Sequence, residues 1–132
     1  MTQIRAIAKD ATQPRWMPVV RDLEIQPTLG LLTCRLHVPH DLPICTDHFQ
    51  AIPIVPGVVQ LGWVIELARA HTLVAGSFTG IISSKFRRIL QPGIDLVARV
   101  ERGRTEDELR FEFTTTDDFV ATCGRLRFGG RP

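Results

Sequence analysis

The feature that most restricts the fold is one apolar helix. From Pro56 to about Thr72 the sequence predicts a helix in which apolar side chains occupy nearly every position around the axis. Pro56 suits the first turn, where its missing N–H costs nothing, and Gly76 suits the exit. A helix that is apolar on all sides is expected to be buried on all sides. The apolar residues are Val58, Val59, Leu61, Trp63, Val64, Ile65, Leu67 and Ala68.

The rest of the chain is patterned for strands. The clearest alternation is in residues 108–115, where Leu109, Phe111 and Phe113 share one face and Arg110 and Glu112 share the other. The predicted strands are 19–26, 29–38, 78–89, 94–102, 108–115 and 119–128, and residues 39–55 are predicted to form an ordered loop. One buried helix among such strands predicts an α+β fold, with an antiparallel sheet wrapped around one long central helix.

Length and composition favour an ordinary globular protein. The 132 residues predict a single domain over 1–132, with a weakly patterned lead-in at 1–15 and a frayed tail at 129–132. The net charge of +2, with acidic residues mixed among the arginines, gives no support to nucleic-acid binding. We expect a cytoplasmic protein with no membrane span, because the N-terminus lacks a signal-like apolar core and Gln60 and Glu66 interrupt the longest apolar run. The three cysteines form no CxxC pair and are expected to be reduced, apolar packing groups.

Three short motifs resemble one enzyme family. His48-Phe49 followed by "PIVPGV" at 53–58 is similar to the "HFPGHPIMPGV" signature of the FabZ/FabA 3-hydroxyacyl-[acyl carrier protein] dehydratases. The string "PGVVQLGW" is similar to the ApeI-like branch, and "KFRR" at 85–88 with "QPG" at 91–93 resembles a strand and turn of the same family. With the strand order, the resemblance covers about residues 18–128.

The resemblance implies a fold, a reaction and partners. The fold would be the hotdog, whose sheet continues across a dimer, here a homodimer or a heterodimer with a related hotdog subunit. The reaction would dehydrate a 3-hydroxyacyl thioester on acyl carrier protein to the trans-2-enoyl thioester, in fatty-acid-like or polyene lipid biosynthesis. It requires no metal or organic cofactor. His37, His40 and His71 are interpreted as structural or surface residues, because nothing around them matches a metal site.

The reaction assigns roles to individual residues. His48 would be the base that removes the C2 proton, because the unperturbed histidine pKa suits that task. Gly57, at a helix N-terminus, would donate its N–H to the charge that develops on the thioester oxygen. The substrate would also contact Phe49, Pro56, Val58 and Gly62. Contact with the acidic carrier protein is assigned to Lys85, Arg87 and Arg88, which alternatively form only the solvated face of a strand.

Gly62 departs from the family pattern. The family places a carboxylate on the helix, fourteen residues after the histidine, and this position is Gly62 here. Glu66 lies one helical turn further on the same face and is our expected replacement for the acid. Three alternatives stay open: a heterodimer whose partner supplies the acid, a non-catalytic acyl-binding hotdog, and a hotdog acyl thioesterase. The acyl chain length and the pathway are not encoded in these motifs.

Overall fold

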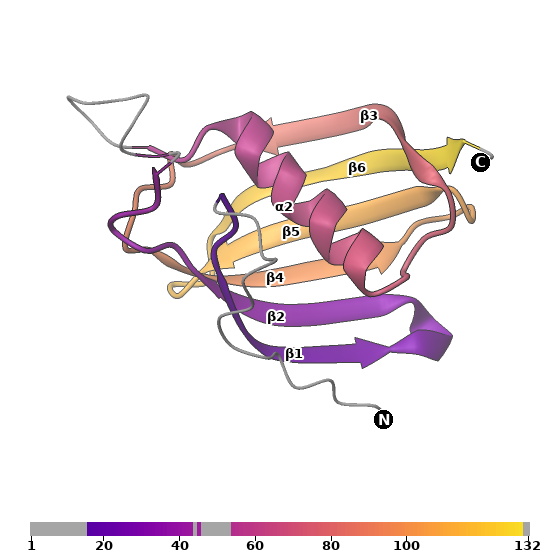
Figure 1. Ribbon diagram of the computed structural model, residues 1–132, viewed down its shortest axis with the longest axis horizontal. Coiled ribbons are helices and arrows are strands. Elements are labelled where there is room, and N and C mark those ends of the chain that lie inside the picture. Colours follow the sequence, from indigo (N-terminus) through magenta and orange to yellow (C-terminus); the bar gives the residue numbers. More distant parts are fainter. Residues whose placement is uncertain (1–15, 44, 46–53, 131–132) are drawn as a thin grey trace.

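The described part of the protein contains a six-stranded antiparallel sheet with the helix α2 across its face (Figure 1). The computed structural model describes residues 16–43, 45 and 54–130. The helix α2 spans Gly57–Ala70. The strands are β1 (Val19–Gln26), β2 (Leu31–His37), β3 (Ser77–Phe86), β4 (Asp95–Arg102), β5 (Glu108–Thr115) and β6 (Val120–Gly130). The predicted α+β class and the order of the elements are confirmed.

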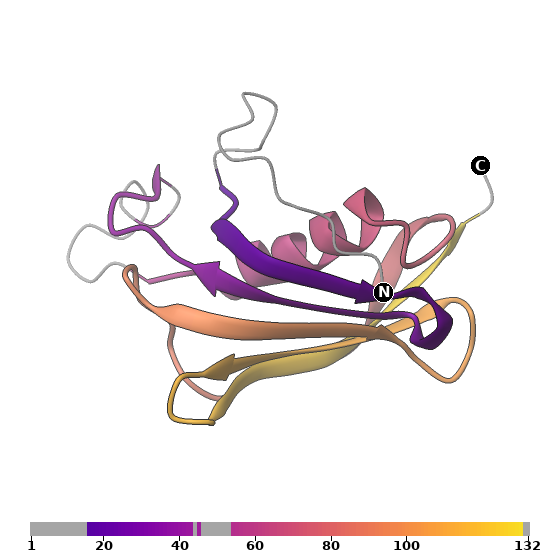
Figure 2. The same ribbon diagram turned by 90° about the horizontal axis from the view of Figure 1, so that it is seen from below.

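The sheet order leaves two strands at the edges. The strands lie in the order β1-β2-β4-β5-β6-β3, and every neighbouring pair is antiparallel. The hairpin β1–β2 is therefore extended by β4 to β6, and β3, which follows the helix in the chain, returns to the far edge. Figure 2 shows that the sheet curves beneath α2. Among the described residues, the edge strand β3 pairs with β6 alone, so its other side is open to pairing with another chain.

The core fills the space between α2 and the sheet. Leu109, Phe111 and Phe113 of β5 are buried, as their alternation predicts, and the Trp63 ring of α2 lies 6.2 Å from the Phe113 ring. The buried residues of α2 are Gln60, Leu61, Trp63, Val64, Leu67 and Ala68. The expected burial on every side is not met within one protomer, because the opposite side of α2 is partly open and Val58 is 76% exposed. No helix in the described ranges has the length and apolarity that crossing a membrane requires.

The strand boundaries differ from prediction by more than one residue at three places. A 3-10 turn at Pro27–Leu29, closed by Gly30 with φ +59°, delays the start of β2 to Leu31. Strand β3 ends at Phe86, because the Arg87 and Arg88 N–H groups both turn to the Ala121 carbonyl. Strand β6 runs on to Gly130, so the predicted tail begins inside the sheet.

The predicted loop at 39–55 lies only partly in the described chain. Residues 44 and 46–53 fall outside it, whereas Pro43 and Cys45 are helical. The predicted turn at 91–93 is confirmed: Gly93 has φ +94°, and a Cβ there would lie 2.4 Å from His40 Cε1. Glycine is required at this turn for both reasons.

Candidate functional site

The start of α2 presents free backbone donors. Pro56 precedes the helix in an extended conformation, and its carbonyl accepts hydrogen bonds from the Val59 and Gln60 N–H groups at 3.1 and 3.2 Å. No side chain in the described part of the chain caps this end. Within the described residues, the N–H groups of Gly57 and Val58 have no hydrogen-bond partner. They therefore form a site for a partial negative charge at the positive end of the helix dipole.

A buried polar chain holds this helix start against the sheet. Gln60 is 2% exposed, and its Nε2 donates to the Val55 carbonyl at 3.2 Å. The hydroxyl of Thr122, on β6, donates to Gln60 Oε1 at 2.6 Å. The Val55 N–H donates to the Leu90 carbonyl at 2.8 Å. Because buried polar groups are costly to leave unpaired, these bonds fix the direction from which Gly57 enters the helix.

Phe86 explains the glycine at position 57. A Cβ on Gly57 would lie 2.8 Å from Phe86 Cζ, inside the closest distance that real side chains adopt. The Phe86 ring, at the end of β3, is 45% exposed and lies against the helix start. Because Gly57 has no side chain, the Phe86 ring can pack directly against the backbone next to the Gly57 N–H.

Trp16 gives a packing reason for the glycine at position 62. A Cβ on Gly62 would lie 3.2 Å from Trp16 Cζ3, closer than an ordinary contact. The Trp16 carbonyl also accepts a hydrogen bond of 2.7 Å from Trp63 Nε1. Trp16, shortly before β1, is therefore tied to α2 at the position where the resembling family has its carboxylate.

This contact predicts a measurable coupling between Trp16 and Gly62. In a Trp16→Ala background, Gly62→Ala should raise the free energy of unfolding by about 1 kcal/mol, the usual gain over a mid-helix glycine. With Trp16 present the gain should disappear, because the new methyl group presses on the ring. Urea unfolding of the two single variants and the double variant measures the coupling. Strictly additive free energies would show that Trp16 does not restrict position 62.

Glu66 is already engaged within the helix. Its two carboxylate oxygens accept hydrogen bonds from Arg69 at 2.7 and 2.9 Å, and its side chain is 22% exposed. His71 follows the helix; partial burial lowers its pKa, and the negative charge of Glu66 opposes this shift. Glu66 shares the partly open side of α2 with Gly62, as the helical spacing predicts.

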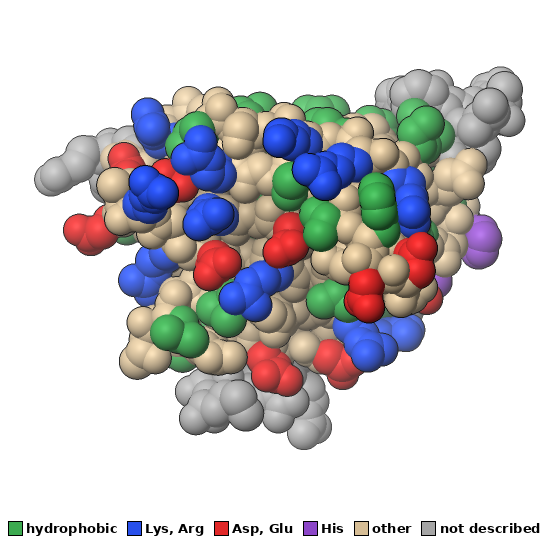
Figure 3. Space-filling view, turned by 180° about the vertical axis from the view of Figure 1, so that it is seen from behind, with side chains coloured by type: hydrophobic (Ala, Val, Ile, Leu, Met, Phe, Trp, Pro, Cys, Tyr) green, Lys and Arg blue, Asp and Glu red, His purple; other side chains and the backbone are tan. Residues whose placement is uncertain are grey.

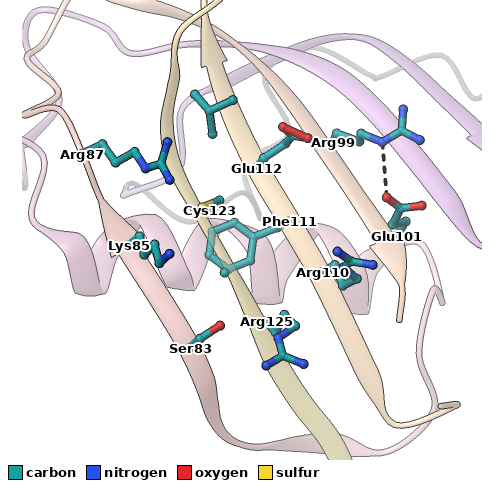
Figure 4. A pocket seen from close by; sticks show the side chains of 12 residues that line it. Ser83, Lys85, Arg87, Arg99, Glu101, Arg110, Phe111, Glu112, Cys123 and Arg125 are labelled. Carbon is teal, nitrogen blue, oxygen red and sulfur yellow. Dashed lines mark hydrogen bonds and ion pairs between the residues drawn. The ribbon is translucent and has the colours of Figure 1, made fainter. Parts of the chain in front are cut away.

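The three cationic residues predicted to bind the carrier protein divide into two groups. Lys85 and Arg87 line a pocket of about 430 Å³ on the face of the sheet opposite α2 (Figure 4). Arg88 forms an ion pair of 3.4 Å with Asp117, and its guanidinium stacks 4.2 Å from the centre of the Phe119 ring. The predicted base His48, its neighbour Asp47 and Phe49 lie outside the described residues.

The described residues offer no metal ligand set. No group of three or more His, Cys, Asp or Glu side chains gathers within them. His37 instead pairs with Asp95 at 2.7 Å, on the open face of the sheet. Burial raises the pKa of the Cys34 thiol to about 12, so this cysteine is an apolar packing group at neutral pH.

Comparison with known proteins identifies the family. The sequence profile of the ApeI-like family, described as ApeI dehydratase, matches residues 24–125. This chain belongs to the ApeI-like dehydratase family. The match includes the helix start, Gly62, Glu66 and the basic pocket, so the ApeI-like family pattern spans every described site residue except Trp16. Among curated proteins, none matches the sequence.

Solved structures support the ApeI-like hotdog fold. The dehydratase heterocomplex ApeI:P from Xenorhabdus doucetiae contains a similar chain, with 27% identity, a TM-score of 0.76 and coverage of 86% of this chain and 98% of that one. An uncharacterised protein from Erwinia carotovora subsp. atroseptica is also 27% identical, with a TM-score of 0.70 and coverage of 84% and 92%. The dehydratase domain of the polyketide PpsC from Mycobacterium tuberculosis shares the fold at 15% identity and a TM-score of 0.61, covering 87% of this chain and 45% of that one.

Several residues of the site were not predicted from sequence. Phe86 stands out in the sequence only as a member of the "KFRR" motif, and Trp16 carries no sequence signal because it lies just outside the first strand. Gln60 does carry one: it is a polar residue in an otherwise apolar helix start, which predicts either exposure or a buried partner. The structure shows the buried partner, Thr122.

Proposed function

We propose that this chain is the base-bearing subunit of a dehydratase that converts a 3-hydroxyacyl thioester into the trans-2-enoyl thioester. The observation that carries the proposal is the pair of N–H groups at Gly57 and Val58, which have no partner among the described residues, in a helix start that retains the "PGV" of the resembling dehydratases. Family membership supports the reaction class. The substrate would be carried on acyl carrier protein, as the resemblance implies.

Each proposed group has a defined chemical task. His48 removes a proton from C2, and the electron pair moves toward the thioester oxygen. The Gly57 N–H donates to this oxygen as its negative charge grows, which lowers the barrier most when the donor is already in place. The electron pair then returns to form the C2–C3 double bond, while the C3 hydroxyl takes a proton from an acid and leaves as water.

The acid is proposed to come from a second subunit. Trp16 occupies the space next to Gly62, and Arg69 engages both oxygens of Glu66, so neither position offers a free carboxylic acid. A similar chain occurs in a dehydratase heterocomplex. We therefore favour a heterodimer whose other hotdog subunit supplies the acid. Glu66, freed from Arg69, is the alternative within a homodimer.

The edge of β3 is the proposed contact with that subunit. Five large apolar side chains are exposed on this strand and on the nearby helix start and loop, namely Val58, Phe78, Ile81, Phe86 and Ile89. Pairing along β3 would satisfy its free backbone groups and cover these side chains at the same time. A second subunit at this edge would also approach the N–H groups of Gly57 and Val58.

Lys85, Arg87 and Arg88 are the proposed contacts with the acyl carrier protein. Lys85 and Arg87 are exposed, so they remain available to an acidic carrier protein. Arg88 would first exchange its contact with Asp117, which is an exposed ion pair and therefore weak.

One assay separates the proposed reaction from its alternatives. A 3-hydroxyacyl N-acetylcysteamine thioester is incubated with the purified wild-type chain, without any partner subunit. The same assay is run with a double variant that carries Trp16→Gly and Gly62→Asp. If the acid comes from a partner, the wild type alone should be nearly inactive, and the double variant should form more enoyl product. Gly62→Asp alone should not gain activity, because Trp16 fills the space.

Glu66→Gln serves as the opposing test. If Glu66 is the acid, the wild type alone should be active and Glu66→Gln should abolish that activity. Release of free acid by the wild type would indicate a thioesterase. Binding of the thioester without any product, in both the wild type and the double variant, would indicate an acyl-binding protein and contradict the proposed reaction.

A further inference from the structure

The face of the sheet opposite α2 carries a basic hollow. Lys and Arg side chains gather on this face (Figure 3), and a pocket of about 430 Å³ opens there between β3, β6, β5 and β4. In Figure 4, Cys123 and Phe111 lie near the middle, with Lys85, Arg87, Arg110 and Arg125 around them. The volume lies in the range of small-molecule sites.

Small residues create the hollow. On β6, Cys123 and Gly124 offer little side-chain volume, and Ser83 on β3 is equally small. A Cβ on Gly124 would lie 2.4 Å from the Ser83 carbonyl oxygen, so glycine is needed for β3 and β6 to pair this closely. Long cationic side chains from four strands surround this low centre, and Phe111 and Val120 add apolar surface.

The arrangement of the cationic side chains in the pocket lowers the stability of the sheet. Arg110 and Arg125 are directly opposite in the register of β5 and β6. Like charges in such a cross-strand pair destabilise a sheet. Five cationic side chains line the pocket, against the two carboxylates of Glu101 and Glu112.

Only some of this positive charge is neutralised. Arg99 pairs with Glu101 at 3.3 Å, and Arg125 pairs with Glu108 at 3.5 Å. Within the residues that the structure describes, Lys85, Arg87 and Arg110 make no ion pair. With Glu108 counted, the positive charges still exceed the negative ones by two. That excess matches one phosphate group, which carries about −1.5 to −2 at pH 7.

We propose that this pocket binds the phosphate group of a small molecule, between Lys85, Arg87 and Arg110 with Arg125 at its rim. Guanidinium groups suit this ligand, because their planar N–H donors match phosphate oxygens in pairs. A bound dianion would also relieve the repulsion between Arg110 and Arg125. The site lies on the opposite face from α2, and the proposal does not depend on the dehydratase reaction.

Calorimetric titration at constant ionic strength tests the proposal with three probes: inorganic phosphate, adenosine 5′-monophosphate and adenosine. Both phosphates should bind, adenosine should not, and Arg110→Gln should weaken phosphate binding about tenfold, as expected for a lost charged hydrogen bond. Tighter binding of the nucleotide than of phosphate would assign an organic phosphate, since Phe111 and Val120 can contact its organic part. Equal affinities would assign free phosphate.

The matched control is Arg35→Gln. Arg35 lies on the same face, outside the pocket, and its removal changes the net charge by the same amount. It should leave the affinity unchanged. A second measurement uses the half-buried Cys123, whose alkylation by iodoacetamide should slow when phosphate is bound. Equal losses from Arg35→Gln and Arg110→Gln, or no binding with no protection of Cys123, would overturn the proposal.

Discussion

Replacing His48 with alanine should lower the rate of enoyl formation by a hundredfold or more. General-base catalysis typically contributes 10²–10⁴-fold, and no other residue of the resembling motif can take a proton at neutral pH. The rate is measured with a 3-hydroxyacyl thioester in whichever assembly shows wild-type activity. The free energy of unfolding should change little, because the proposed task of His48 is chemical.

The control for this experiment is His37→Ala. His37 lies on β2 and pairs with Asp95 on the far side of the sheet from α2, so its removal costs one partly exposed ion pair. It should leave the rate unchanged. If His48→Ala keeps activity within a few-fold of the wild type, another group is the base and the proposed mechanism is wrong.

Local patterns in the sequence were sufficient to predict most of the fold. The helix could be predicted because residues 56–72 are far more apolar than an exposed helix. Strand β5 could be predicted because Leu109, Phe111 and Phe113 alternate with charged residues. Both signals come from burial against the same core. The ends of some strands could not be predicted in this way. The start of β2 depends on the turn at Pro27–Leu29 and the left-handed Gly30, and the end of β3 depends on hydrogen bonds to the Ala121 carbonyl.

The site was predictable only where a motif named its residues. Gly57 and its helix position follow from "PGV", whereas the reason for Gly62 does not follow from any local pattern. No local pattern predicts that Trp16, more than forty residues earlier, packs on Gly62 and accepts a hydrogen bond from Trp63. Contacts between distant segments depend on the packing of the whole domain. Gly62, which stands where the family has a carboxylate, therefore also has a packing role that the sequence does not predict.

The same contact changes how the missing acid should be restored. The family pattern alone predicts that Asp or Glu at position 62 is enough to restore the acid. A Cβ at that position would lie 3.2 Å from Trp16 Cζ3, so the ring must shift or be removed before a carboxylate fits there. The Trp16 ring packs where the family has its carboxylate. This is consistent with the proposal that this subunit supplies the catalytic base and not the acid.

Replacing Gly57 with proline should lower the turnover rate by a hundredfold to a thousandfold. Loss of one oxyanion donor has an effect of this size, and proline removes the N–H while leaving the backbone in place. The helix tolerates the change: position 57 is the first helical residue, where proline is favoured. Pro56 already has φ −61° and ψ 147°, the extended conformation that a following proline requires.

The comparison must remove the steric effect of the new side chain. Any Cβ at position 57 would press on the Phe86 ring at 2.8 Å, so both test variants are made in a Phe86→Ala background. There, Gly57→Ala adds a Cβ and keeps the N–H, whereas Gly57→Pro adds a Cβ and removes it. The two should unfold at similar urea concentrations, while only the proline variant loses turnover, because the donor acts on charge that develops in the transition state. Equal turnover in the two variants would mean that the thioester oxygen receives its hydrogen bond elsewhere, and Gly57 would then serve only to admit the Phe86 ring.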